Sequence, residues 1–343
     1  MAYTTIDNPE LFFNTVLYTG NGGTQSITGV GFQPDWLFIK SRGSTGNGRI
    51  HDVVRGVDKQ LYTSLTNAEY TYSPNTGVTS FDSDGFSLGS DIGQNTNTET
   101  YVAWNWLAGG TASSNSNGSI TSSVSVNTTA GFSIVSYTGT GSNATIGHGL
   151  GVAPSVIIVK PRNSSSEGFA MYHKGIASDA ETDFIRWDET NAAADNANYW
   201  NDTAPTSTVF SIGTDSATNG TTNNIAYCFA EVKGYSKFGS YTGNGGNQFI
   251  YTGFKPAFVI EKRSSNTSEW DVYDNKRNTF NSVTKVLKPN ASDAEATYSG
   301  LNFLSNGFEA LGSLNDSGQR LIYLAFAETP FVTAGTKAAG TAR

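Results

Sequence analysis

The sequence predicts an all-β protein made of three tandem related antiparallel β-sandwich modules of the jelly-roll type. Charged residues make up 15% of the 343-residue chain, against about 25% in an average soluble protein, and glycine is abundant at 38 residues. Short apolar runs alternate with clusters of Gly, Asn, Asp, Ser and Thr, as expected for short strands joined by many turns. The tripeptide Tyr-Thr-Gly recurs at 18–20, 137–139 and 241–243. Long amphipathic helices, which need Glu, Lys, Ala and Leu, are nearly ruled out.

Each Tyr-Thr-Gly is followed by the same series of elements, which is the pattern of an internal repeat. A Gly-x-x-Pro comes first, with its proline about sixteen residues after the tyrosine. An apolar strand follows, and a lysine lies six positions after the proline. An aromatic strand closes each copy. We expect the apolar strands at 36–39, 156–159 and 258–260, and the closing strands at 101–106, 226–231 and 323–328.

Two copies also contain a hairpin before the closing strand. In the first copy Asp84-Gly85 joins two apolar runs at 81–89, and in the third Asn306-Gly307 does so at 303–312. Asp-Gly and Asn-Gly are strong turn signals because such turns need a positive φ. The second copy keeps only the outgoing run, at 209–213.

The spacing of the repeats places the modules at 1–110, 131–234 and 235–331. Residues 111–130 are rich in Gly, Ser, Asn and Thr and contain no aromatic or charged side chain, which predicts a linker. Residues 332–343 are mostly Ala, Gly and Thr, which predicts a mobile tail.

The ionisable residues exclude several classes of function. With 21 Lys and Arg against 29 Asp and Glu, the formal charge is −8, so there is no basic surface to bind nucleic acid. One cysteine and three histidines supply neither a disulfide nor a cluster at metal-ligand spacing, so we expect no cofactor. The N-terminus lacks the basic and apolar stretches of a signal peptide, and no apolar run is long enough for a membrane span. We therefore expect synthesis in the cytoplasm and no membrane insertion.

No sequence motif for catalysis is present, and we expect no enzymatic activity. The chain lacks a Gly-x-Ser-x-Gly elbow, a phosphate loop, His-Glu-x-x-His and a dinucleotide fingerprint. Cys228 lies between Tyr227 and Phe229 in an expected interior strand, which indicates a core thiol rather than a nucleophile. A glycosidase carboxylate pair leaves no motif, because its two acids can lie far apart in the sequence, so that alternative stays open.

Basic residues recur where each apolar strand ends. One interpretation is a patch that binds anionic groups in every copy. The other, which we favour, is a structural role in which the basic side chains lie over the sheet and pair with a carboxylate. Asp52-x-x-Arg55 and Asp274-x-x-Arg277 recur at matched places and can supply that carboxylate. The recurring basic residues are Lys40, Arg42, Lys160, Arg162, Lys262 and Arg263.

Four tryptophans are candidate carbohydrate-binding residues. Trp187, Trp200 and Trp270 lie in stretches rich in Asn and Asp, and Trp106 lies in the first closing strand. Aromatic rings stack on the apolar faces of sugars while short polar groups bind the hydroxyls. Plain loop packing is the favoured alternative for the three loop tryptophans.

Trp104 and Trp106 project from one face of their strand. Matching the closing strands puts a phenylalanine of the other copies level with Trp104 and a glutamate level with Trp106, so Trp104 is expected in the core and Trp106 is left open.

Asp82 and Asp84 are the candidates for a metal site. In Asp-Ser-Asp-Gly the carboxylates alternate as they do at the opening of a calcium loop. The later ligands of such a loop, including its final Glu, are missing, and the third copy has Ser-Asn-Gly at the same place. We therefore favour a structural turn and expect no metal.

A family signature runs through nearly the whole chain. It comprises the opening Met-Ala-Tyr-Thr-Thr-Ile-Asp-Asn-Pro-Glu and the stretches at 17–22, 31–40, 54–56, 80–90, 101–110, 234–240 and 326–331. In these segments the chain resembles virion proteins of marine tailed phages, including short-tailed phages of cyanobacteria and of abundant marine heterotrophs. The resemblance implies a tail-fibre-like or simply structural virion protein, and it brings no catalytic residues.

Composition and resemblance together predict a virion structural protein, made in the host cytoplasm and exposed on the phage particle. We expect a tail-fibre-type adhesin for host attachment, in which each module binds glycan weakly and repetition raises the effective affinity. The alternative is a capsid decoration or cement protein that binds neighbouring shell proteins, and a glycan depolymerase is a third, less favoured hypothesis. Expected partners are other virion proteins and a host-surface glycan. For the oligomeric state we expect a homotrimer, with two alternatives left open: three modules that imitate a trimer within one chain, and heterologous packing of subunits.

Overall fold

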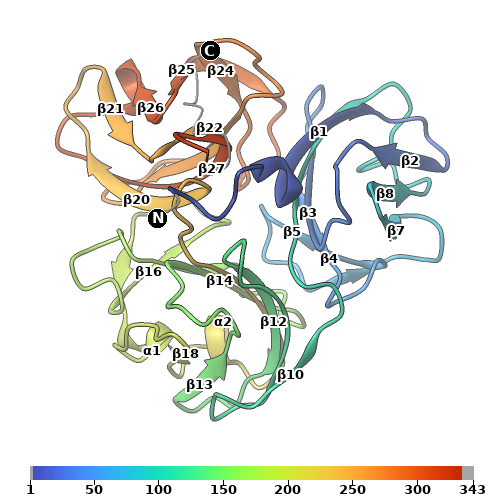
Figure 1. The fold of residues 1–343 in the computed structure, drawn as a ribbon. Coiled ribbons are helices and arrows are strands. Elements are labelled where there is room, and N and C mark those ends of the chain that lie inside the picture. The colour runs from blue at the N-terminus through green and yellow to red at the C-terminus, as the bar shows by residue number, and fades with distance from the viewer. Residues whose placement is uncertain (1–2, 334–343) are drawn as a thin grey trace.

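Strands make up nearly all of the regular structure in the computed structural model, which describes residues 3–333. The all-β prediction is confirmed. The sheets form three lobes around a common centre (Figure 1), and the paired strands of each sheet belong to one lobe. The helical segments are short, and none within residues 3–333 is long and apolar enough to cross a membrane. They are η1 (Pro9–Leu11), α1 (Ala197–Trp200), α2 (Ser216–Asn219) and η2 (Gly312–Leu314).

Lobe one contains the strands β1 to β9. A six-stranded sheet in the order β1-β9-β3-β4-β5-β6 packs on a three-stranded sheet in the order β2-β8-β7, and apolar residues of both sheets form one cluster between them. The strands are β1 (Phe13–Thr19), β2 (Gln25–Thr28), β3 (Trp36–Ser41), β4 (Arg49–Asp52), β5 (Lys59–Tyr62), β6 (Tyr70–Thr71), β7 (Val78–Asp82), β8 (Gly85–Leu88) and β9 (Thr100–Trp106).

Lobe two contains the strands β10 to β19. An eight-stranded sheet in the order β10-β11-β12-β19-β14-β15-β16-β17 is accompanied by the pair β13-β18. The strands are β10 (Ser113–Asn115), β11 (Ser122–Asn127), β12 (Phe132–Thr138), β13 (Ala144–Gly147), β14 (Val156–Pro161), β15 (Ala170–His173), β16 (Asp183–Arg186), β17 (Ala194–Asp195), β18 (Val209–Ile212) and β19 (Asn223–Phe229).

Lobe three contains the strands β20 to β27. Two four-stranded sheets, β20-β27-β22-β23 and β21-β26-β25-β24, enclose an apolar cluster of their own. The strands are β20 (Ser236–Thr242), β21 (Gln248–Tyr251), β22 (Phe254–Arg263), β23 (Trp270–Asp274), β24 (Val283–Val286), β25 (Ala296–Leu304), β26 (Gly307–Ala310) and β27 (Arg320–Pro330).

The three lobes share one strand order, which allows residues to be matched by register. The shared orders are β1-β9-β3-β4, β12-β19-β14-β15 and β20-β27-β22-β23. Trp106 pairs with the first residue of β3, and Phe229 and Phe326 occupy the same place opposite Val156 and Phe258. The sequence comparison that placed a phenylalanine level with Trp104 is therefore wrong by two residues.

Residues 111–130 are not a linker. They contain β10 and β11, which pair with each other and extend the sheet of lobe two through β12. Val124 is buried, and the buried hydroxyl of Ser122 donates to the Gly147 carbonyl at 2.7 Å. A strand that is buried on one face can be built from alternating Ser and Val as well as from larger apolar residues. The polar composition of this segment therefore wrongly predicted a linker. Of the expected mobile tail, residues 334–343 lie outside the described residues.

Aromatic rings from all three lobes meet at the centre. Trp36 and Trp106 of lobe one lie with their ring centroids 4.5 Å apart, and Trp36 lies 5.8 Å from Phe229 of lobe two. Trp106 lies 5.7 Å from Phe258 of lobe three, and Phe229 lies 6.0 Å from Phe326. One apolar cluster includes buried residues of every lobe. The lobes therefore share a core and form one body rather than separate domains, each with its own core only.

Candidate functional site

The three recurring lysines fasten the lobes to one another. Lys40, Lys160 and Lys262 are buried, and each ammonium group donates to carbonyls of its own lobe and of the neighbouring lobe. Burial lowers the pKa of each to about 8. Buried ammonium groups with carbonyl partners cannot serve as a surface patch for anions, so that interpretation is wrong. The acceptors within the same lobe include Gly46, Ser164 and Ser268, and those in the neighbouring lobe are Ala291, Thr66 and Thr190.

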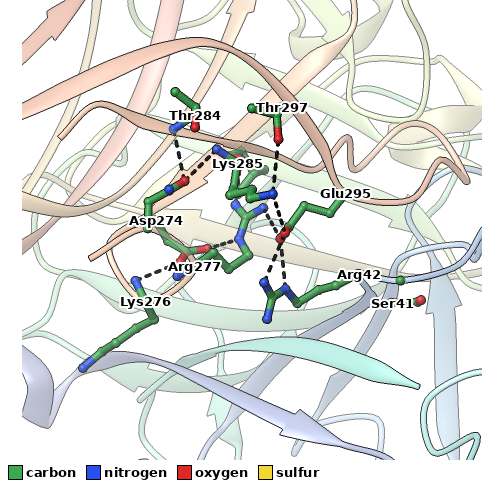
Figure 2. A network of polar contacts seen from close by, with 12 residues as sticks. Ser41, Arg42, Asp274, Lys276, Arg277, Thr284, Lys285, Glu295 and Thr297 are labelled. Carbon is green, nitrogen blue, oxygen red and sulfur yellow. Dashed lines mark hydrogen bonds and ion pairs between the residues drawn. The ribbon is translucent and has the colours of Figure 1, made fainter. Parts of the chain in front are cut away.

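Two of the recurring arginines pair with carboxylates across the lobe boundaries. Arg42 of lobe one binds Glu295 of lobe three through Nε and Nη2 at 2.9 and 3.1 Å (Figure 2). Arg162 of lobe two binds Glu69 of lobe one through the same two nitrogens, both at 2.8 Å. Two-point contacts of this kind fix the arginine plane as well as its charge. The favoured structural role is thus observed, although the carboxylate is a glutamate of the next lobe and not Asp52 or Asp274.

Each glutamate also joins a buried Asp–Arg pair. Arg277 donates to Asp274 at 2.6 Å and to Glu295 at 3.4 Å, and Asp274 further accepts the indole N–H of Trp104 at 3.0 Å. Figure 2 shows Glu295 between Arg277 and Arg42. The same arrangement occurs between lobes one and two. We call these sets the clasps: Asp52, Arg55, Glu69, Arg162 and Tyr227 form the first, and Asp274, Arg277, Glu295, Arg42 and Trp104 form the second.

Among residues 3–333, the junction between lobes two and three lacks the Asp–Arg pair and glutamate that make up a clasp. His173 stands opposite Val156 in the register that Asp52 and Asp274 occupy in the other lobes, and Ile176 follows where they have Arg55 and Arg277. The N–H of Ala193 donates to the Ser264 carbonyl at 2.8 Å, as the N–H groups of Glu69 and Glu295 do to Arg162 and Arg42.

His173 stands in the place of the aspartate and makes hydrogen bonds there instead of an ion pair. Its Nδ1 accepts the N–H of Gly175 at 3.0 Å, and its Nε2 lies 3.2 Å from the Tyr323 carbonyl of lobe three. Burial lowers the pKa of His173 to about 4, so the imidazole is neutral. The residue that matches Arg42 and Arg162 is Ser264, and its neighbour Arg263 pairs with Asp316 of its own lobe at 3.2 Å.

A polar pocket of about 510 Å³ lies in lobe three beside Arg263. Glu261 and Asp271 face each other across β22 and β23, and the hydroxyl of Tyr241 donates to Glu261 at 3.2 Å. The matched pairs are Ile39 with Arg49 in lobe one and Val159 with Ala170 in lobe two, so this acid pair is particular to lobe three. The lining residues are Glu261, Lys262, Arg263, Ser268, Glu269, Asp271, Lys288, Tyr298, Leu314 and Leu321.

The acids of this pocket have unusual protonation. Burial, followed by the charge of Asp271, raises the pKa of Glu261 to about 8, and burial raises the pKa of Asp271 to about 6. At neutral pH Glu261 is therefore mostly protonated, with an O–H that can donate beside the oxygen that accepts from Tyr241, and Asp271 is mostly an ionised acceptor. The half-exposed ring of Tyr298 lies beneath the ammonium group of Lys288, 5.9 Å from its centroid. Mixed donors and acceptors beside a ring suit a hydroxyl-rich ligand. Within the described residues no three His, Cys, Asp or Glu side chains are placed to hold a metal ion.

A family model for a domain of unknown function, DUF7483, matches residues 8–330. The chain belongs to the DUF7483 family. The match covers all three lobes and is not confined to one of them. Among curated proteins, none matches the sequence.

The four candidate tryptophans of this DUF7483 domain are all buried, with at most 3% of any one exposed. Trp106 and Trp187 belong to the shared core, Trp200 packs against Tyr172 with ring centroids 6.1 Å apart, and the indole of Trp270 donates to the Arg186 carbonyl at 3.0 Å. Their assignment as sugar-stacking residues is wrong, because their rings are covered by the rest of the protein; the favoured alternative of plain packing for Trp187, Trp200 and Trp270 is what the structure contains.

Asp82 and Asp84 stabilise a turn. Asp84 accepts the N–H groups of Gly29 at 3.1 Å and Gly31 at 2.7 Å, and these bonds lower its pKa. Asp82 accepts the hydroxyls of Ser80 and Ser87, both at 2.7 Å. The favoured structural turn is what the structure contains.

Sequence reasoning missed the glutamates of the clasps and a set of structural asparagines. Asn-Ala-Glu at 67–69 and Asp-Ala-Glu at 293–295 recur, with Asn-Ala-Ala at 191–193, and that repeat was available as a signal. Three buried asparagines each accept the N–H of the residue after Tyr-Thr-Gly and so hold that loop in place. They are Asn95, Asn219 and Asn315, which bind Asn21, Thr140 and Asn244.

Proposed function

We propose that the protein is a phage virion structural protein, exposed on the particle, which acts as a tail-fibre-type adhesin for host-surface glycan. The observation that carries the proposal is the polar pocket of lobe three, about 510 Å³ in volume, with the facing acids Glu261 and Asp271 and the half-exposed ring of Tyr298. The resemblance to virion proteins of marine tailed phages supports a place on the phage particle. The hydroxyl-binding chemistry of the pocket supports a glycan as the ligand.

The pocket suits a neutral sugar better than an ion. Its lining carries carboxylates and cationic groups together, namely Glu269 and Asp271 with Arg263 and Lys288, so no strong field of one sign remains. Hydroxyls can both donate and accept, and they use such a mixture fully. In seawater-strength salt, charge-based contacts are screened within roughly 4 Å, which also favours hydrogen bonding and stacking.

Avidity would arise from copies on the particle rather than from the three lobes of one chain. The four tryptophans that were the candidates for sugar contact are buried. The acid pair occurs in lobe three, since the matched positions in the other lobes hold Ile39 and Arg49, and Val159 and Ala170. Each chain then contributes one such pocket, and repetition on the particle raises the effective affinity.

Calorimetric titration of the purified chain with soluble host polysaccharide tests the proposal. Asp271→Ala removes a partly buried acceptor, and the affinity should fall about 10- to 100-fold, the value of hydrogen bonds to a charged group. Asp58→Ala, which removes a half-exposed carboxylate of lobe one, is the matched control and should bind like the wild type. Equal binding by wild type and Asp271→Ala, or no binding by either, would overturn the proposal.

A decoration or cement role is the second candidate, and the clasps favour it. Lobes tied by the ion pairs Arg42–Glu295 and Arg162–Glu69 and by a shared core make a rigid block, which is a useful property for a part that bridges shell subunits. Locating the protein in intact particles separates the two roles: density at regular lattice points of the shell would favour decoration and refute the adhesin.

Glycan hydrolysis is tested on the same samples. The facing acids Glu261 and Asp271 are the kind of pair that glycosidases use. Only 3% of Glu261 is exposed, however, which suits a residue that shapes a binding pocket better than one that protonates a leaving group. We expect no new reducing ends when the chain is incubated with the polysaccharide.

A further inference from the structure

Two exposed aromatic rings lie side by side along an edge strand of lobe three. In β21 the alternate residues Phe249 and Tyr251 are 47% and 56% exposed, whereas Ile250 between them is buried in the lobe. Because side chains two apart in a strand share one face, both rings project outward, with their backbone positions roughly 7 Å apart. β21 is the first strand of the order β21-β26-β25-β24, so it lies at the edge of its sheet.

The matching strand of lobe one has no such rings. β2 pairs with β8 as β21 pairs with β26, and it has the same alternation of burial. Its outward residues are Ser26 and Thr28. The strand therefore forms with small polar residues at these two places, and the fold does not explain why lobe three exposes large apolar rings there.

The rings are held in position from one side. The aromatic ring of Phe249 lies over the backbone of Gly307, where even a methyl group would come within 2.9 Å of it. The hydroxyl of Tyr251 lies 3.4 Å from that of Tyr3, which itself donates to the Gly253 carbonyl at 2.6 Å. Because these rings are already restrained, they lose less side-chain entropy than freely rotating rings would when a ligand stacks on their outer faces.

Polar groups suited to hydroxyls adjoin the rings. Glu309 stands directly opposite Phe249 across β21 and β26, and its carboxylate accepts the amide of Asn302 at 2.8 Å. A ring beside a carboxylate and an amide is an arrangement that sugars use, because the apolar sugar face covers the ring while its hydroxyls bond to the polar groups. The carboxylate of Glu309 and the chain's formal charge of −8 disfavour an acidic polysaccharide.

We propose that this outer face, formed by Phe249, Tyr251, Glu309 and Asn302, is a second glycan-binding site, distinct from the pocket with Glu261 and Asp271. Its ligand is a neutral polysaccharide whose sugar rings stack on Phe249 and Tyr251. The inference rests on the proposed function in host-glycan attachment and adds to it the class of glycan and the surface that contacts the glycan chain.

The test substitutes into lobe three the residues that lobe one uses. Phe249→Ser with Tyr251→Thr keeps β21 in a form that the matching β2 demonstrates, so the double variant should fold. Neutral β-1,3- and β-1,4-gluco-oligosaccharides and acidic alginate oligosaccharides serve as probes in calorimetric titrations of the full chain. We expect the wild type to bind a neutral probe more tightly than alginate, and the double variant to bind it at least about tenfold more weakly. Phe280→Ser, which removes another exposed ring, should leave binding unchanged.

The outcomes separate this site from the pocket. If Asp271→Ala weakens binding and the double variant does not, the aromatic face is refuted while the proposed function stands. If the wild type binds none of the neutral probes, the aromatic face is refuted, and failure to bind host polysaccharide as well would refute the proposed function. If the double variant keeps its affinity but loses self-association seen in the wild type by light scattering, the face binds a second copy and not a glycan. Loss of neutral-glycan affinity in the double variant, with Phe280→Ser unchanged, supports the proposal.

Discussion

Replacing Glu295 with alanine should loosen the contact between lobes one and three. The change removes the two-point contact with Arg42 at 2.9 and 3.1 Å and the contact with Arg277 at 3.4 Å. Arg42 is 22% exposed and Arg277 fully buried, so the loss lies between that of a surface pair, about 0–1 kcal/mol, and that of a broken buried pair, about 3–5 kcal/mol. Arg277 keeps Asp274, which places the expected loss at about 2–3 kcal/mol.

Scanning calorimetry measures this loss as a lower Tm. An unfolding entropy of about 2.1 cal/mol/K per residue gives about 0.7 kcal/mol/K for the chain, so Tm should fall by about 3–4 °C. Alanine fits the site, since Ala193 occupies the matching place and makes the same backbone hydrogen bond. Glu10→Ala breaks the exposed pair with Lys276 and should hardly move Tm. An equal shift in Glu295→Ala and Glu10→Ala would refute the clasp as a source of stability.

Three further changes have defined outcomes. Burial lowers the pKa of His173 to about 4 in the folded protein, whereas in the unfolded chain it is near 6.5. As the pH falls from 6.5 to 4 the unfolded chain therefore binds a proton that the folded protein does not, and the wild type should lose up to about 3 kcal/mol of stability relative to His173→Gln. Urea unfolding at each pH measures this loss. Glu261 has the opposite sign: its raised pKa of about 8 means that ionisation disfavours the folded state, so Glu261→Gln should gain stability over the wild type as pH rises from 4.5 to 8, and a flat difference in Tm would contradict this. Trp106→Ala should cost about 3–5 kcal/mol in the same urea assay. Trp106→Phe should cost less, because Phe229 and Phe326 fill the matching places, and equal losses would argue against a packed core there.

The sequence repeat predicted much of the local structure and little of what joins the lobes. Strands at 36–39 and 101–106 follow from apolar runs bounded by turns, and the structure has β3 and β9 there. The recurrence of Lys40, Lys160 and Lys262 was visible in the sequence. Their partners were not, because each ammonium group reaches a carbonyl of another lobe, and backbone carbonyls carry no sequence signal.

The candidate sites were misjudged for two physical reasons. Trp270 and Trp187 were kept as sugar-binding candidates because polar residues surround them, yet their rings are covered, since a stretch rich in Asn and Asp can bond to itself and still pack over a ring. The acids of the lobe-three pocket were missed because Glu261 and Asp271 meet only through strand pairing. Phe249 and Tyr251 could have been found by comparing β21 with β2 residue by residue.

The clasps also impose an order on assembly during synthesis. Glu69 and Arg162 are 93 residues apart, so the first clasp can form while lobe three is still being made. Arg42 must wait for Glu295, 253 residues later, which at about 5–20 residues per second is a delay of roughly 10–50 s. Until then lobe one presents the central face of Trp106 without its lobe-three cover. Lobe three, which contacts both other lobes, is made last, so the nascent chain is most exposed to aggregation or chaperone capture while this lobe is incomplete.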